Sequence, residues 1–262
     1  MARVSDAPHY PTGHQLLAGQ SVLITAAAGT GIGFATAKRC IEEGARVMVS
    51  DIHERRLGEA CERLRALPGA VVESKVCDVT REDDVRALVA TGIASMGQLD
   101  VLVNNAGLGG SASVVEMTDE QWSRVLDVSL TSVFRMTRAV LPHMYARGSG
   151  VIVNNASVLG WRAQALQSHY AAAKAGVMAF TRCSAVEAAE QGVRINAVAP
   201  SIAMHEFLNR VTSDDLLKDL RRREAFGRTA ETWEVANVIV FLASPLASYM
   251  TGEVISVSSQ HP

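Results

Sequence analysis

Residues 21–33 read Ser-Val-Leu-Ile-Thr-Ala-Ala-Ala-Gly-Thr-Gly-Ile-Gly, an apolar run that passes directly into a glycine-rich turn. The run at 21–25 is typical of a buried strand, and a helical pattern follows over 33–43. In such a strand–turn–helix unit, the backbone N–H groups at the helix N-terminus can bind a pyrophosphate. Because glycines also occur in ordinary tight turns, the turn predicts the local fold but does not by itself identify a ligand.

The same alternation continues along the chain. Strand-like runs rich in Val, Ile and Leu occur at 21–25, 46–51, 71–78, 99–105, 150–157, 194–200 and 253–258. Helical patterns lie near 33–43, 54–66, 81–96, 119–147, 169–191 and 231–243. Apolar strands that alternate with helices predict an α/β fold with a doubly wound parallel sheet and right-handed crossovers.

Two segments fall outside this alternation. Residues 1–18 form a polar leader ahead of a single domain at 19–262. The connection after the sixth strand has about thirty residues, which is longer than a connection needs. We interpret residues 203–228 as a short helical substrate lid, whose apolar side chains are Phe207, Leu208, Val211 and Phe226.

The composition limits the classes of protein that fit. The chain has 262 residues, 25 basic and 27 acidic side chains, and 48% hydrophobic residues. These values exclude a mainly disordered chain and argue against nucleic-acid or membrane-coating proteins. The cysteines form no C-x-x-C pair and the histidines no H-E-x-x-H motif, so we expect no metal site. No run resembles a signal peptide or membrane span, so we expect a cytoplasmic protein.

Asp51 ends the second predicted strand, eighteen residues after Gly33 (51 − 33). A carboxylate at that place can bind a ribose 2′-hydroxyl and repel a 2′-phosphate, which favours NAD(H). The nearby Arg55 and Arg56 keep NADP open, and a solvated aspartate at a strand end is the plainer alternative.

Polar residues also end the third and fourth predicted strands, in Cys77-Asp78-Val79 and Asn104-Asn105-Ala106-Gly107. Ligands of an open parallel sheet bind beyond the carboxyl ends of its strands, so these termini would border one crevice. Asn and Gly are also common in strand-to-helix turns, which is the structural alternative.

Tyr170 and Lys174 lie four residues apart near the start of a predicted helix, which places both side chains on one face. An ammonium ~4 Å from a phenol interacts by roughly 4 kcal/mol, enough to lower the pKa of the phenol by up to about three units. Tyr170 could then exchange a proton near neutral pH. Only four of the 25 basic residues are lysines, so chance pairs with this spacing number about 0.06.

Ser157 ends the fifth predicted strand, thirteen residues before Tyr170 (170 − 157). Its hydroxyl can donate a hydrogen bond to a substrate oxygen as charge develops there. A helix N-cap or turn serine is the alternative. No serine lies in a G-x-S-x-G motif, which argues against a triad hydrolase.

In combination, these motifs resemble those of the short-chain dehydrogenase/reductase family, from about Leu17 to Val257. The resemblance implies a single Rossmann-type domain with a seven-stranded sheet and a nicotinamide cofactor. It also implies hydride transfer between a ketone and a secondary alcohol, and a homotetramer.

The resemblance assigns roles to the matching residues. Tyr170 is the acid/base, Lys174 lowers its pKa and binds the nicotinamide ribose, and Ser157 orients the substrate oxygen. Ser129 stands where the family carries an Asn that supports a proton relay. The implied cofactor contacts are Thr25, Gly29, Gly31, Ile32, Gly33, Asp51, Asp78, Val79, Asn105, Ala106, Gly107, Tyr170, Lys174 and Pro200.

Other positions depart from the family pattern. Ala26 stands where a glycine is usual, and the turn before Gly31 is one residue longer. Ser201 replaces the glycine of a Pro-Gly pair, and Met204 and His205 lie where a threonine is usual. The usual Asp-Gly-Gly near the C-terminus is replaced by 258–260, Ser-Ser-Gln.

The segments AAAGTGIG, VLDVSLTSVF, NNASVLGW and VISVSSQHP also resemble a subgroup of reductases that act on CoA-linked hydrindanone acids from sterol ring breakdown. The run Arg221-Arg222-Arg223 could bind CoA phosphates, although a solvated helix face is the plainer interpretation. Two alternatives stay open: a 3-oxoacyl-thioester reductase of the fatty-acid type, and a non-catalytic dinucleotide-binding protein.

Overall fold

The computed structural model describes residues 7–204 and 214–260. Its main sheet is parallel, with the strand order β3-β2-β1-β4-β5-β6-β9. The strands are β1 (Ser21–Ile24), β2 (Arg46–Asp51), β3 (Val72–Val76), β4 (Val101–Asn104), β5 (Gly150–Asn155), β6 (Val193–Pro200) and β9 (Val254–Val257). The predicted doubly wound sheet of seven strands is therefore confirmed. The chain crosses from β3 at one edge to β4 beyond β1, which opens a crevice at the carboxyl ends of β1 and β4.

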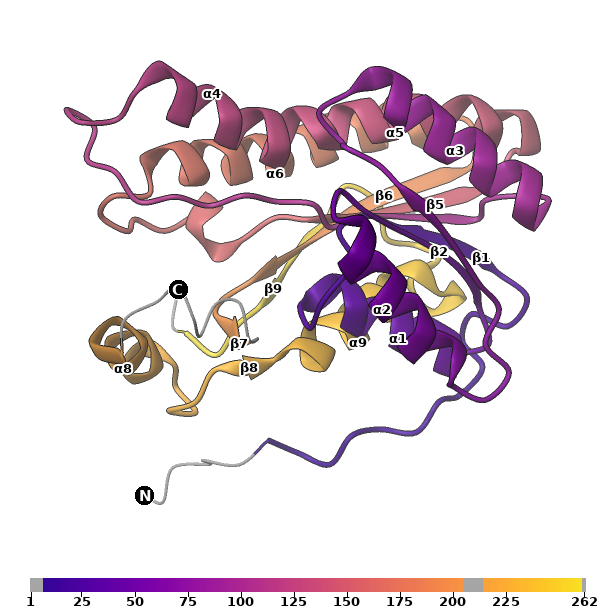
Figure 1. Ribbon diagram of the computed structural model, residues 1–262, viewed down its shortest axis with the longest axis horizontal. Helices are drawn as coiled ribbons and strands as arrows, with labels where there is room; N and C mark the ends of the chain where they lie inside the picture. The colour runs from indigo at the N-terminus through magenta and orange to yellow at the C-terminus, as the bar shows by residue number, and fades with distance from the viewer. Residues whose placement is uncertain (1–6, 205–213, 261–262) are drawn as a thin grey trace.

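Helices cover both faces of this sheet (Figure 1). One face carries α1 (Ile32–Glu42), α2 (Glu54–Arg65) and α9 (Thr232–Ala243). The other carries α3 (Glu82–Met96), α5 (Ser132–Arg147) and α6 (Ser168–Ala189). Apolar residues at helical spacing form the buried stripes, as Leu57, Cys61 and Leu64 do on α2. The inner strands β1, β2, β4, β5 and β6 are mostly buried on both faces, which explains their many apolar residues, whereas the edge strands β3 and β9 are more exposed.

The helix predicted at 119–147 is interrupted. It consists of α4 (Asp119–Leu126), a π-helical segment (Asp127–Thr131) and α5. A capping box starts α4, because the Thr118 hydroxyl accepts from the N–H of Gln121 while the Gln121 side chain accepts from the N–H of Thr118. The prediction of helical structure over 119–147 is confirmed, and the π-helical segment within it is a finding of the structure, because apolar spacing does not register one extra residue in a turn.

The predicted lid begins at β7 (Ala203–Met204), which pairs with β8 (Ala230–Glu231) in a small separate sheet. Helix α8 (Asp214–Arg223) lies between them in the chain. Phe207, Leu208, Val211 and His205 fall outside the described residues. Helix α8, which belongs to the predicted lid, lies beyond the end of the sheet to which β9 leads (Figure 1).

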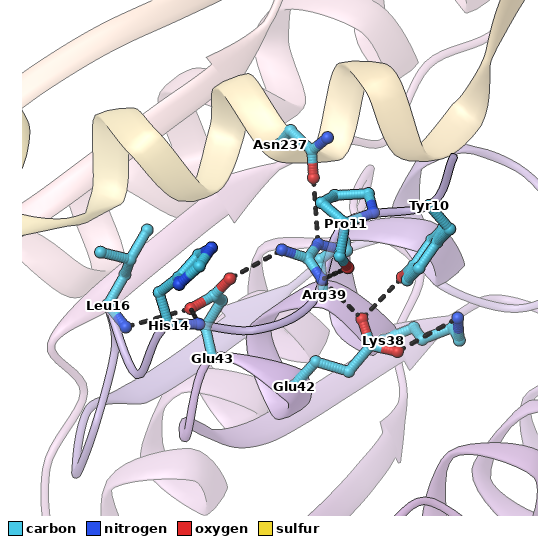
Figure 2. A network of polar contacts seen from close by, with 9 residues as sticks. All are labelled: Tyr10, Pro11, His14, Leu16, Lys38, Arg39, Glu42, Glu43 and Asn237. Carbon is cyan, nitrogen blue, oxygen red and sulfur yellow. Dashed lines mark hydrogen bonds and ion pairs between the residues drawn. The ribbon is translucent and has the colours of Figure 1, made fainter. Parts of the chain in front are cut away.

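The described part of the polar leader packs against α1 and α9 (Figure 2). The backbone N–H groups of His14 and Leu16 donate to Glu43 Oε2, at 2.7 and 3.1 Å. The Tyr10 ring meets Trp233 of α9 edge to face, with centroids 5.3 Å apart. These contacts connect the leader to the helix that follows the glycine-rich turn. No helix within residues 7–204 and 214–260 is both long and apolar enough to cross a membrane.

Candidate active site

Ser157 follows β5 and caps a short 3₁₀ turn at Val158–Gly160. Its Oγ accepts a hydrogen bond of 3.2 Å from the N–H of Leu159. Because a hydroxyl that accepts one hydrogen bond can still donate its proton, the capping role and the proposed catalytic role are compatible. Ser157 is 9% exposed, so the rigid turn fixes a mostly buried hydroxyl at the end of β5.

Tyr170 and Lys174 lie on the first two turns of α6. The Lys174 Nζ atom is 5.5 Å from the centroid of the Tyr170 ring. Lys174 is 2% exposed and donates a hydrogen bond of 2.7 Å to the backbone carbonyl of Asn155. The spacing of the two residues therefore does bring them onto one face, beside the end of β5.

The electrostatics of this pair differ from the prediction. Burial lowers the pKa of Lys174 to about 8. Burial raises the pKa of Tyr170, while the hydrogen-bonding contribution of Ser157 lowers it, and the net direction is upward. The predicted net lowering of the Tyr170 pKa is not found, because loss of hydration at the phenol outweighs the contribution that favours the phenolate.

A chain of amides connects Lys174 with the glycine-rich turn. The side chain of Asn155 donates to Asn105 Oδ1 at 2.9 Å, and Asn105 Nδ2 donates to the carbonyl oxygens of Thr25 and Ala26. Thr25 Oγ1 accepts from the N–H groups of Asn105 and Ala106 at 3.0 and 3.1 Å. Asn155 is the residue that sequence reasoning missed, although the Asn-Asn pair ending β5 repeats the pair that ends β4.

The glycine-rich turn leads into α1 as predicted. Gly31 is the N-cap and offers no side chain to the first N–H groups of α1, which leaves them available to an anion. At Gly33, a Cβ atom would collide with the carbonyl oxygen of Ala26 and the amide of Asn105. Ala26 has a φ of 52° and Gly29 a φ of 100°. Ala26 thus adopts the left-handed conformation that glycine favours, at the position where the resembled family has glycine.

Asp51 ends β2 with 9% of its surface exposed. Its carboxylate accepts from the N–H groups of Ala28 at 3.2 Å and His53 at 3.0 Å. Burial raises the pKa of Asp51, while the hydrogen bond from Ala28 and the charge of Arg56 lower it. The carboxylate is thereby fixed between the glycine-rich turn and the start of α2.

A cavity of about 640 Å³ extends from this end of the sheet toward α4. Its lining includes Ile52, Asp78, Thr80, Trp122, Asp127 and Thr131. Val79 is buried beside Asp78, whose carboxylate accepts from the N–H and the hydroxyl of Thr80. The free helix N-terminus, the close approach at Gly33 and this cavity together fit a dinucleotide along the carboxyl ends of β1 to β4.

Ser129 lies in the π-helical segment and is fully buried. Its Oγ accepts from the N–H of Leu108 and donates to the carbonyl of the same residue, both at 2.9 Å. A Cβ at Gly107 would lie 3.4 Å from Lys174 Nζ and 3.9 Å from Ser129 Oγ. Ser129 therefore holds the loop that follows β4 close to Lys174. Pro200 ends β6 in register with Val257.

Residues 26–259 match the family described as enoyl-(acyl carrier protein) reductase. The chain is 65% identical over 260 residues, 99% of both chains, to the (5R,7aS)-5-hydroxy-7a-methyl-1-oxo-2,3,5,6,7,7a-hexahydro-1H-indene-carboxyl-CoA reductase of Mycobacterium tuberculosis. It is 40% identical over 245 residues to a 3-oxoacyl-[acyl-carrier-protein] reductase of Thermotoga maritima, covering 92% of this chain and 97% of that one. A solved short chain dehydrogenase from Mycobacterium smegmatis has 59% identity and a TM-score of 0.89, covering 99% of this chain and 100% of that one.

Proposed function

Because the chain belongs to the short-chain dehydrogenase/reductase family, whose members are oxidoreductases of alcohols and ketones, we propose that it is an NAD(H)-dependent reductase of a bicyclic CoA thioester. The proposed substrate is a hydroxylated hydrindanone acid bound to CoA. The observation that carries the chemistry is the placement of Ser157, Tyr170 and Lys174 together beside the glycine-rich turn.

Residues of this chain supply the proton and bind the oxygen atom of the substrate. The nicotinamide supplies or accepts the hydride when it is bound. Ser157 donates its hydroxyl proton in a hydrogen bond to the substrate oxygen. Tyr170 is a protonated phenol at neutral pH, as an ordinary tyrosine is, and gives its proton to that oxygen in ketone reduction. The Lys174 ammonium, whose Nζ lies 5.5 Å from the centroid of the Tyr170 ring, then stabilises the phenolate that remains.

The first experiment removes the proposed acid. Tyr170→Phe is expected to lower kcat by about a thousandfold or more, because the ring stays in place while the transferable proton is lost. NADH binding, measured by titration of nicotinamide fluorescence, should remain within about threefold of the wild-type value. Wild-type turnover in this variant would contradict the proposal.

The cofactor preference rests on the Asp51 carboxylate, which a 2′-phosphate would approach. Steady-state assays should give kcat/KM for NADH at least about tenfold above that for NADPH. Asp51→Ala should narrow that ratio, whereas Asp78→Ala should leave the ratio between the two cofactors unchanged. A wild-type preference for NADPH would contradict the assignment.

The substrate class is supported by the relative from Mycobacterium tuberculosis, which is 65% identical over nearly the full chain. Arg221 and Arg222 on α8 are exposed, while Arg223 pairs with Asp219 at 2.7 Å. Replacing all three arginines with glutamine is expected to raise KM for the CoA thioester well above any effect on the matching free acid. Equal effects on both substrates would remove this reason for CoA recognition.

The fatty-acid-type alternative has a specific observation in its favour, the 40% identity to the 3-oxoacyl-[acyl-carrier-protein] reductase. A substrate panel separates the two functions. A higher kcat/KM for a linear 3-oxoacyl thioester, together with NADPH preference, would favour the alternative. The proposal also includes a homotetramer in the cytoplasm. Light scattering on the purified protein measures the mass of the assembly and so tests the number of subunits.

A further inference from the structure

The three residues that follow β9 replace the glycine-rich ending of the resembled family with Ser258, Ser259 and Gln260. Gln260 lies between two oppositely charged side chains. The guanidinium of Arg162 donates to Gln260 Oε1 and, at 3.3 Å, to its backbone carbonyl. On the other side, Gln260 Nε2 donates to Glu224 Oε1 at 2.9 Å. A single amide therefore accepts from a cation and donates to an anion.

Glu224 depends on this tail for its hydrogen bonds. It is 4% exposed and accepts from the N–H of Ser259 at 3.2 Å, from its hydroxyl at 2.7 Å, and from Gln260. The N–H of Ala225 donates back to the carbonyl of Ser259 at 2.9 Å. Within residues 7–204 and 214–260, Glu224 has no basic side chain in ion-pair range. A buried carboxylate without a cation relies on neutral donors, so removing any of them is costly.

The two partners of Gln260 belong to different segments of the chain. Arg162 lies five residues after Ser157, in the loop that leads to Tyr170. Glu224 directly follows α8, the described helix of the insertion. In Figure 1, α8 lies beyond the end of the sheet to which β9 leads. The contacts of Gln260 thus connect the loop between Ser157 and Tyr170 with the end of α8.

We infer that Gln260 is a positioning residue, which holds α8 against the Ser157–Tyr170 loop and thereby sets the affinity for a substrate that reaches α8. This inference rests on the proposed function for its substrates. Glutamine suits the position because its amide presents an acceptor oxygen to Arg162 and, from a separate atom, a donor N–H to Glu224. A glutamate at this place would still pair with Arg162 but would repel Glu224.

The test compares two substrates that differ only beyond the reacting ring, a CoA thioester of a keto-hydrindane carboxylic acid and the free acid. Gln260→Ala is expected to raise KM for the thioester by about tenfold, with kcat for both substrates within about twofold of wild type. Gln98→Ala is the matched control, because Gln98 also donates its amide to a carboxylate, Asp100, ahead of β4. Its KM values should not change. Equal losses on both substrates, or none, would overturn the inference.

A swap of the two side chains separates positioning from a general structural defect. Gln260→Glu alone should raise KM for the thioester at least as much as Gln260→Ala. The double variant Gln260→Glu, Glu224→Gln restores one carboxylate and one amide, and should recover most of the wild-type KM. No recovery in the double variant would contradict a direct contact.

A second readout does not depend on catalysis. Hydrogen exchange at the end of α8, over residues 217–226, should be about tenfold faster in Gln260→Ala than in the wild type, and unchanged in Gln98→Ala. If the wild type turned over neither substrate, the proposed function would fail while this measurement still tested the contact. Unchanged exchange in Gln260→Ala would overturn the inference even where turnover is normal.

Discussion

Arg39 and Lys174 are both cations with almost no exposed surface, 4% and 2%, yet their surroundings differ completely. Arg39 lies on α1, in the network of Figure 2, where each part of its guanidinium has a partner. Lys174 lies on α6 in the candidate active site. Arg39 donates to Glu43 at 2.7 Å, Glu42 at 2.9 Å, Asn237 at 3.0 Å and the carbonyl of Pro11 at 3.2 Å, whereas the hydrogen bond found for Lys174 goes to the carbonyl of Asn155.

The pKa directions follow from these partners. At Arg39, burial alone would lower the pKa, but Glu42 and Tyr10 raise it beyond its usual value. At Lys174, burial lowers the pKa to about 8. A buried cation that is paired with carboxylates contributes to a stable structure. A buried cation whose loss of hydration is not offset by a carboxylate is typical of a functional site. In this fold, Arg39 therefore stabilises the structure, whereas the buried charge of Lys174 lowers its stability.

The largest expected effect comes from removing the Lys174 ammonium. Lys174→Met should lower kcat by at least about a hundredfold, because the phenolate of Tyr170 loses its stabilising charge. The same change should raise the free energy of unfolding at pH 7 by about 1–3 kcal/mol, because a desolvated ammonium is replaced by an apolar side chain of similar length. Urea denaturation and steady-state kinetics on one preparation measure both.

The matched control for that variant is Lys75→Met, at a partly exposed lysine on β3. It should keep wild-type activity and a free energy of unfolding within about 0.5 kcal/mol of wild type. If Lys174→Met were instead less stable than wild type, the hydrogen bond to Asn155 would outweigh the cost of burial, and the contrast with Arg39 would disappear.

Removing Arg39 should lower the free energy of unfolding and leave kcat nearly unchanged, the opposite of the effects expected for Lys174. Arg39→Met leaves the carboxylate of Glu43, which is 1% exposed, without its cation, and should cost about 3–5 kcal/mol of unfolding free energy. The kcat of the folded fraction should stay within about twofold of wild type. The double variant Arg39→Met, Glu43→Leu should recover part of the loss, since neither charge then stays buried alone. A large fall in kcat with unchanged stability would show that Arg39 acts on the site.

The pH dependence of the free energy of unfolding measures how much the burial of the Lys174 ammonium destabilises the fold. The lysine titrates at 10.5 when unfolded and about 8 when folded, so the unfolded chain binds more protons between those values. Stability from this group therefore rises with pH through that window, by about 3 kcal/mol in total. Buried Cys40 and Cys77, each with a pKa raised to about 12, act in the opposite direction above pH 9. The difference between wild type and Lys174→Met cancels the thiols and should shrink as the pH rises from 8 to 10.

The contrast also separates what sequence can predict from what it cannot. The sheet, the turn at Gly33 and the shared face of Tyr170 and Lys174 follow from local spacing, and the structure has all of them. The raised pKa of Tyr170 does not follow, because it depends on atoms that the fold packs around the phenol. The link through Asn155 likewise joins residues that are distant in sequence. Partners brought together by tertiary structure leave no periodic signal in the chain.

The smallest expected effect concerns the outer edge of the Arg39 network. The hydroxyl of Tyr10 donates to Glu42 Oε2 at 2.6 Å, and Lys38 Nζ lies 3.9 Å from the centroid of the Tyr10 ring. Tyr10→Phe removes only the hydroxyl and keeps the ring against Lys38 and Trp233, so it should cost about 1 kcal/mol of unfolding free energy. Tyr10→Ala removes the ring as well and should cost more, with kcat unchanged in both. A lower kcat in Tyr10→Phe would mean that the leader acts on the active site through α1, and the division between a stabilising and a functional cation would have to be given up.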